Sequence, residues 1–153
     1  MDLILWRHAE AHDLADGQDD LKRDLTSRGE KQATRMASWL DRQLPDGARI
    51  LVSPSRRTEQ TAQALHRKFK LRPELAPDAT VEQLLQLVQW PLAKHPVVVV
   101  GHQPTLGQTI AHLLGLPLNE VSVKRGAIWW LRYREREAGA QTVVVTVQSP
   151  EVM

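Results

Sequence analysis

Residues 97–100 are four consecutive valines, and this run constrains the fold more than any other feature of the sequence. A strand with one face in water alternates apolar and polar residues, whereas a strand covered on both faces is apolar throughout. Valine is β-branched and favours strands over helices. We therefore expect a buried strand in a mostly parallel sheet that carries helices on both sides.

Further runs have the length and composition of strands, namely residues 3–6, 50–52, 127–131 and 142–147. Apolar residues at helical spacing predict four helices, which begin near Ser27, near Ser53, near Val81 and after Pro104. The first is expected to start with a capping box from Ser27 to Glu30, and the second with Ser53 as the N-cap before Pro54.

The last two predicted strands are joined by the short polar segment 134–141, which favours an antiparallel pair at one edge of the sheet. Trp129 and Trp130 are neighbours in a strand and point to opposite faces, so both indoles are buried only if both faces are covered. We therefore predict an α/β fold, a three-layer α/β/α sandwich with a mostly parallel central sheet. Residues 1–153 form one domain in this prediction.

Composition excludes several classes of function. Cysteine is absent, which rules out disulfide frameworks, thiolate zinc sites and thiol nucleophiles. The 20 Lys and Arg nearly balance the 18 Asp and Glu, and the basic residues are scattered, so we expect no nucleic-acid partner. Met1 leads directly into a strand and no apolar run is long enough for a membrane helix, so we expect a cytoplasmic protein without membrane contact.

Polar residues follow three of the predicted strands at the point where each strand ends. These residues are Arg7-His8, the segment 53–57 and Gly101-His102. Ligands of open α/β sheets bind outside the carboxyl ends of the strands, where helix N-termini converge. Two histidines and two arginines gathered there repel one another unless an anion is bound, so this edge of the sheet predicts an anion site.

Arg56 and Arg57 are neighbours in the first turn of the second predicted helix. Arg57 is in step with the core-facing Thr58 and Thr61, and its side chain is directed back toward the strand end. Arg56 is out of step with that face. We therefore assign Arg57 to the anion site and Arg56 to the solvent.

A metal site is the alternative interpretation, because His8 and His12 have the spacing of two ligands on one helix face. His8 follows a strand, however, and the acidic segment after it is typical of a loop. No spacing selects a third ligand among Asp13, Asp19 and Asp20. We expect neither a metal nor another cofactor.

Three segments together resemble a known family. They are LWRHAEA at residues 5–11, SPSRRTEQTA at 53–62 and VGHQP at 100–104. They are similar to motifs of the histidine phosphatase superfamily, whose fold is the phosphoglycerate mutase-like fold. KRDLTSRGEKQA at 22–33 resembles a segment of its short, SixA-type branch of phosphohistidine phosphatases. Ala9 stands where the Arg-His-Gly motif of the superfamily has glycine.

The resemblance implies that His8 is a nucleophile that takes up the phosphoryl group and later loses it to water. It also implies that Arg7, Arg57 and His102 surround the phosphoryl oxygens. Ser53 is a further candidate for a hydrogen bond in this pocket. Phosphate, sulfate and vanadate are the anions that such a pocket is expected to bind.

The general acid stays unassigned, because Asp78 and Glu82 do not match the position of the acid in larger members. An alcohol needs a proton as it leaves, whereas a phosphorylated imidazole can leave as neutral imidazole if its other nitrogen is already protonated. We therefore expect a phosphohistidine phosphatase whose partner is a phosphorylated protein, such as a histidine-phosphotransfer domain or another phosphocarrier. The alternatives are a broad small-molecule phosphomonoesterase and a non-catalytic module that binds phosphoproteins.

Overall fold

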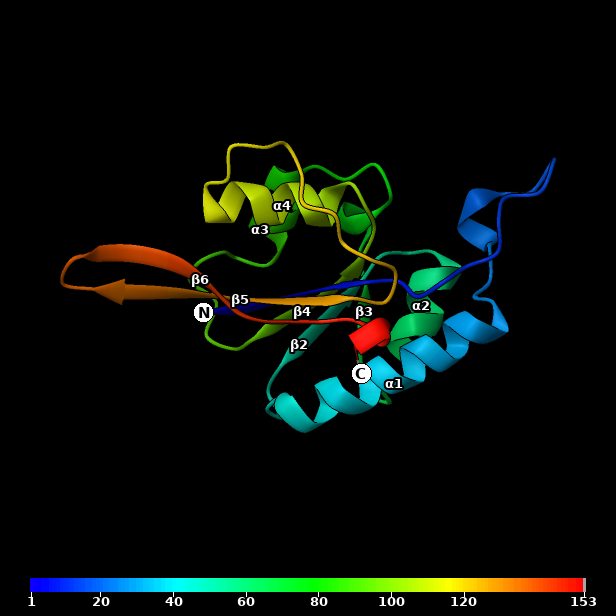
Figure 1. Ribbon diagram of the computed structural model, residues 1–153, viewed down its shortest axis with the longest axis horizontal. Helices are drawn as coiled ribbons and strands as arrows, with labels where there is room; N and C mark the ends of the chain where they lie inside the picture. Colours follow the sequence, from blue (N-terminus) through cyan, green and yellow to red (C-terminus); the bar gives the residue numbers. More distant parts are fainter. Residues whose placement is uncertain (153) are drawn as a thin grey trace.

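The computed structural model of the protein describes residues 1–152 and contains a six-stranded sheet with helices on both faces (Figure 1). The strands are β1 (Asp2–Arg7), β2 (Arg49–Val52), β3 (Lys70–Leu71), β4 (Val97–Gly101), β5 (Ile128–Arg136) and β6 (Gly139–Gln148). The helices are α1 (Ser27–Gln43), α2 (Arg56–Gln63), α3 (Val81–Leu87) and α4 (Thr105–Leu114), with short 3-10 turns η1 (Asp20–Lys22), η2 (Pro73–Leu75) and η3 (Pro150–Val152). Among the described residues, no helix has the length and apolar character that a membrane span requires.

The strand order is β3-β2-β4-β1-β5-β6. β3, β2, β4 and β1 are parallel to one another, whereas β5 is antiparallel to β1 and β6 is antiparallel to β5. The mostly parallel sheet with an antiparallel edge pair is therefore confirmed. Because β2, β4 and β1 are adjacent and parallel, their carboxyl ends meet at one edge of the sheet.

Alternate residues of the central strands enter two separate cores. Ile4 and Trp6 of β1 pack with residues of α1 and α2 on one face of the sheet. Leu3 and Leu5 pack with residues of α3 and α4 on the other face. All five residues of β4 are buried, as expected for a strand covered on both sides. The three-layer α/β/α sandwich is confirmed.

The two adjacent tryptophans of β5 lie on opposite faces, as their neighbouring positions predict. Trp130 belongs to the core under α1 and makes an edge contact with Trp39, with 6.4 Å between the ring centroids. Trp129 packs against the core under α3 and α4 but stays partly exposed. The covering of the second face is thus incomplete near the edge of the sheet.

Two helix starts differ from the prediction. The N-cap of α1 is Thr26, not Ser27, and its side chain accepts a hydrogen bond from the backbone of Gly29. The N-cap of α2 is Ser55, not Ser53. Ser53 is fully buried, and its hydroxyl lies against the histidine that follows β4, His102, instead of the start of the helix.

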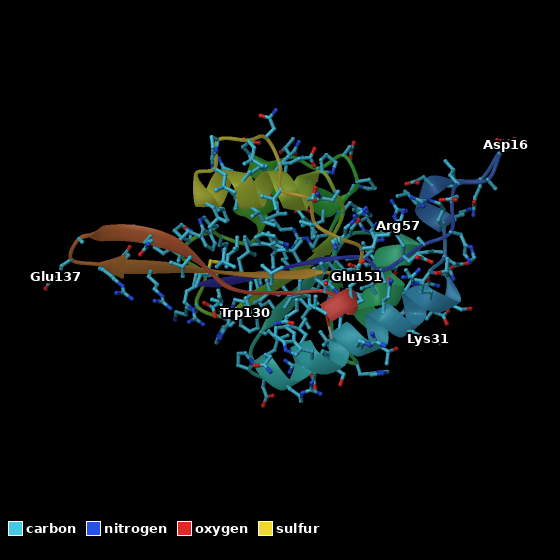
Figure 2. All side chains as sticks on the ribbon, in the orientation of Figure 1. Asp16, Lys31, Arg57, Trp130, Glu137 and Glu151 are labelled. Carbon is cyan, nitrogen blue, oxygen red and sulfur yellow. The ribbon has the colours of Figure 1, made fainter. Side chains whose placement is uncertain are left out.

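The segment 134–141 is not a simple connection. β5 and β6 run through it as a paired hairpin, in which Arg136 lies opposite Gly139, so that only residues 137 and 138 form the turn. Figure 2 shows Glu137 at the tip of this hairpin, at the opposite end of the molecule from Asp16. The charged residues of the hairpin hid its strands from a search for apolar runs. β3 was missed as well, because its two residues, Lys70 and Leu71, are exposed and form no apolar run.

Candidate active site

His8 is the first residue after β1, and backbone hydrogen bonds fix its position. Its N–H donates to the carbonyl of Gly101 at 3.1 Å, and its carbonyl accepts from the N–H of Gly126 at 2.9 Å. The residue is only 7% exposed, and its Nδ1 lies 2.8 Å from the carbonyl oxygen of Ala9. Because a carbonyl only accepts hydrogen bonds, Nδ1 carries the ring proton, and Nε2 of the neutral ring keeps a free electron pair.

The surroundings of His8 keep the ring neutral. Burial lowers the pKa of His8 to about 3, and the positive charges of the neighbouring Arg57 and Arg7 act in the same direction. The hydrogen bond to Ala9 opposes this shift but is the weaker influence. His8 is therefore an uncharged imidazole at neutral pH, which is the form that acts as a nucleophile.

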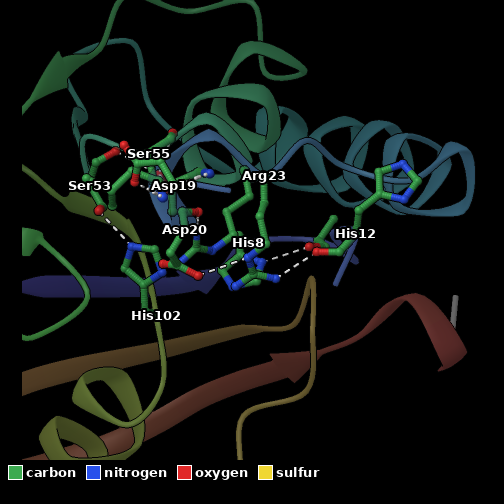
Figure 3. A network of polar contacts seen from close by, with 12 residues as sticks. His8, His12, Asp19, Asp20, Arg23, Ser53, Ser55 and His102 are labelled. Carbon is green, nitrogen blue, oxygen red and sulfur yellow. Dashed lines mark hydrogen bonds and ion pairs between the residues drawn. The ribbon is translucent and has the colours of Figure 1, made fainter. Parts of the chain in front are cut away.

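His102 follows β4, and its ring centroid lies 5.5 Å from that of His8. Its Nε2 is 2.7 Å from the hydroxyl of Ser53, a contact drawn in Figure 3, whereas its Nδ1 is buried without a hydrogen-bond partner. Burial and the charge of Arg57 lower the pKa of His102 to about 3. The ring is therefore neutral, and one of its nitrogens is left for a ligand.

Arg57 and Arg56 point in different directions, as the helical spacing predicts. Arg57 is 3% exposed, and two of its nitrogens donate to Asp20, Nη1 to the backbone carbonyl at 2.8 Å and Nη2 to the carboxylate at 3.0 Å. Arg56 is exposed and pairs with Asp24. The Nε atoms of Arg57 and Arg7 are buried without a partner, although Arg7 also donates to the carbonyl of Val123.

A cavity of about 160 Å³ joins these side chains at the carboxyl edge of the sheet. Its lining consists of Arg7, His8, Ala11, Arg23, Arg57, Pro77, His102, Gln103 and Arg125. Four of these lining residues are arginines, and no carboxylate is among the described residues that line the cavity. Burial and the charges of Arg125 and Arg57 lower the pKa of Arg7, which is the expected sign of crowded cations. This charge distribution favours an anion.

The structure brings together the four residues expected at the strand ends, and Ser53 lies behind His102, outside the lining. It adds Arg23, Gln103 and Arg125, which the sequence analysis did not assign. Arg23 lies in the segment that resembles the SixA-type branch, so that a signal for it was present. Arg125 belongs to the connection before β5, and nothing in a single sequence links it to the strand ends.

The residues considered for other chemistry lie elsewhere. His12 is exposed, and Figure 3 shows it apart from His8. The part of the chain that the structure describes contains no group of three His, Cys, Asp or Glu side chains that could hold a metal ion. Asp78 and Glu82 are exposed, and neither lines the cavity.

Comparisons with known proteins agree with this geometry. Residues 3–80 match the sequence model of the histidine phosphatase superfamily, branch 1. The phosphohistidine phosphatase SixA of Escherichia coli is 32% identical over 123 residues, which cover 74% of each chain. A phosphohistidine phosphatase SixA homolog of Haemophilus influenzae is 30% identical over 131 residues, covering 75% of this chain and 78% of the homolog. The solved structure of the protein histidine phosphatase SixA complexed with tungstate superposes with a TM-score of 0.76 at 27% identity and covers 99% of both chains.

Proposed function

The chain belongs to the histidine phosphatase superfamily and to its SixA-type branch, and on this premise we propose that it hydrolyses phosphohistidine on a protein. One observation carries the proposal. His8 is buried among cations as a neutral ring, with Nδ1 bound to the carbonyl of Ala9 and Nε2 free to attack phosphorus.

In the first step, Nε2 of His8 attacks the phosphorus atom of the substrate phosphohistidine. An N–P bond forms at His8 while the P–N bond of the substrate breaks, and its electron pair stays on the leaving nitrogen. The other nitrogen of the substrate ring already carries a proton, so the ring leaves as neutral imidazole. The charge of the transferring group is spread over three equatorial oxygens. Arg7, Arg57 and His102 donate hydrogen bonds to these oxygens, and the neutral His102 does so through Nδ1 when Ser53 donates to Nε2.

In the second step, water attacks the phosphorus atom of phospho-His8. The bond between phosphorus and Nε2 breaks, and its electron pair returns to the ring. The water oxygen and one of its two protons stay in the released phosphate, and the second proton passes to the solvent. Throughout, Nδ1 of His8 keeps its proton and donates a hydrogen bond to the carbonyl of Ala9.

Two features of the cavity favour a phosphohistidine substrate. The lining formed by the described residues contains no carboxylic acid that could protonate an alcohol as it leaves, whereas an imidazole whose other nitrogen is protonated leaves as a neutral base. The volume of about 160 Å³ is smaller than the roughly 300–1,000 Å³ of sites that enclose small organic ligands. We expect only the phosphoryl group and its imidazole ring to enter this space. The rest of the substrate would then stay outside, which suits a phosphohistidine on the surface of a protein.

The test compares substrates and traps the intermediate. The protein is incubated with a phosphohistidine-containing histidine-phosphotransfer domain and with a panel of sugar phosphates, and phosphate release is followed. We expect release from the phosphoprotein at a much higher kcat/KM. Rapid quenching with a labelled phosphodonor should yield a phosphoenzyme that is labile in acid and stable in base, as the P–N bond of histidine requires.

Variants identify the groups that act. His8→Ala should abolish the label and turnover, and Arg57→Ala should lower kcat by roughly 10²-fold or more, the typical effect of losing one oriented donor. Arg56→Ala is the matched control in the same helical turn and should change little, since its side chain pairs with Asp24 in solvent. Near-normal turnover by His8→Ala would refute the mechanism. Faster hydrolysis of the sugar phosphates would instead favour a broad phosphomonoesterase, and binding without release would indicate a phosphoprotein-binding module.

A further inference from the structure

The loop between β1 and α1 carries a carboxylate that the proposed reaction has not used. The loop is closed at its base by a β-bridge between Ala11 and Leu25 and by a hydrogen bond from His12 N–H to the carbonyl of Asp24. Asp20 begins the short turn η1 within it, and Asp19 caps this turn by accepting from the N–H of Leu21. The position of Asp20 is thus determined by local hydrogen bonds.

Asp20 binds two of the arginines that line the cavity. Its carboxylate accepts from Nη2 of Arg57 at 3.0 Å and from Nε of Arg23 at 2.9 Å, and its backbone carbonyl accepts from Nη1 of Arg57 at 2.8 Å. Arg23 also donates to the carbonyl of His12 at 2.8 Å. Asp20 itself is absent from the lining, so it lies behind the arginines.

The contact with Arg57 has the features of an ion pair that orients its partner. The Arg57 side chain is 4% exposed, and a buried guanidinium is costly unless a counter-charge is hydrogen-bonded to it. The charge of Arg57 holds the pKa of Asp20 below its usual value, against the opposing influence of burial. Arginine has five N–H donors, and two of those on Arg57 are bound by Asp20, so three remain for a ligand, Nε among them.

We infer that Asp20 is a positioning residue of this site, which orients Arg57 and Arg23 so that their remaining donors meet the phosphoryl oxygens. The inference rests on the proposed function, because it assigns Asp20 a task in the same phosphoryl transfer. Asp20 touches neither the nucleophile nor the phosphoryl group in this role and acts only through the two guanidinium groups.

Loss of this carboxylate should affect the transition state more than the ground state. Oriented donors contribute most where charge develops during the reaction, so a loosely held Arg57 lowers kcat. At the same time, removing a negative charge beside the cavity favours anion binding, which offsets the lost orientation in the bound substrate. We therefore expect kcat to fall while KM changes little.

The experiment uses Asp20→Ala and Asp20→Asn with the phosphohistidine protein as substrate. For Asp20→Ala we expect kcat to fall about 10-fold or more, with KM within about threefold of the wild-type value. Vanadate, which mimics the five-coordinate transition state, should lose affinity in parallel with kcat, whereas inorganic phosphate should bind as before. The kcat of Asp20→Asn should lie between those of the wild type and Asp20→Ala, because its amide oxygen still accepts a hydrogen bond from Arg57 but carries no charge. If Asp20→Ala does not fold, Asp20→Asn provides the test.

A double-mutant cycle separates positioning through Arg57 from a general effect of the loop. If Asp20 acts through Arg57, adding Asp20→Ala to Arg57→Ala should lower kcat by no more than about threefold further. Asp24→Asn is the matched control, since Asp24 joins the same loop to the same helix through the neighbouring Arg56. It should leave kcat and KM unchanged.

Several results would overturn the inference. Equal or higher kcat in Asp20→Ala would mean that the carboxylate is idle or obstructs the site, and an equal loss in Asp24→Asn would indicate a purely structural loop effect. Independent, multiplicative losses in the cycle would exclude positioning through Arg57. If Arg57→Ala is harmless by itself, the proposed function fails and the inference falls with it, whereas a damaging Arg57→Ala with an idle Asp20 refutes the inference alone.

Discussion

Lowering the pH from 7 to 5 should strongly destabilise the folded protein, because two buried histidines stay neutral in it. The pKa of His8 and that of His102 are each lowered to about 3, whereas the ordinary value of histidine is 6.5. The unfolded chain therefore binds more protons than the folded chain between these two values. The stability that the two neutral rings contribute is fully present above pH 6.5 and is lost as the pH falls toward 3.

The magnitude follows from the two pKa values. At pH 5, a histidine with a pKa of 6.5 is almost fully protonated in the unfolded chain, and one with a pKa of about 3 is neutral in the fold. The difference amounts to about 2 kcal/mol per histidine, or about 4 kcal/mol for the pair. The two contributions add, because both rings are uncharged in the folded state at this pH and do not repel each other. Domains are stable by about 5–15 kcal/mol, so the loss is a large share.

Urea unfolding at pH 7 and pH 5 measures this loss, in buffers free of phosphate and sulfate so that no anion fills the cavity. With a slope of about 2 kcal/mol per molar, the midpoint should fall by about 2 M urea. His8→Gln and His102→Gln replace each ring with a group that does not titrate. Each single variant should show about half of the wild-type loss, and the double variant should show little.

His112→Gln, at an exposed histidine of α4, is the control and should retain the full loss. Asp2 and Asp20 contribute little to this loss, because their pKa values lie below the ordinary 3.8. Wild-type stability that is equal at pH 7 and pH 5 would refute the reasoning. So would single variants that lose as much stability as the wild type.

Three further predictions test the fold and the site. Gly29→Ala should lower the free energy of unfolding in urea by about 1–3 kcal/mol, because the new Cβ would collide with the backbone oxygen of Glu10. Ser27→Ala, at an exposed position of the same helix, is the control. A loss no larger than that of the control would contradict this close packing. Ser53→Ala should lower kcat about 10-fold, because His102 loses its hydrogen-bond partner at Nε2; normal turnover would show that this bond does not orient the ring. Prolonged treatment with a chelator should leave phosphatase activity unchanged, since the described residues offer no group of three ligands; loss of activity with rescue by zinc or magnesium would revive the metal interpretation.

The sequence by itself determined the features that depend on neighbours along the chain. The valine run of β4 predicts a strand covered on both faces, and the structure confirms two cores on either side of it. Helical spacing predicts that Arg57 and not Arg56 points inward, and Arg57 is buried. Periodicity and strand composition encode which face of an element is covered, and they are legible without knowing what covers it.

Only the tertiary structure decided which distant residues complete the cavity. Arg125 reaches it from the connection before β5, and no sequence pattern indicated this residue. Arg23 lies in the segment that resembles the SixA-type branch, but only the structure shows that its contact with Asp20 places it in the lining. The residues around Ser53 predicted it as the helix cap, but its hydroxyl lies against His102, which follows the adjacent strand β4, and Ser55 caps the helix. Such contacts depend on strand order and loop closure, which bring together residues far apart in the sequence. Local sequence patterns do not predict contacts of this kind.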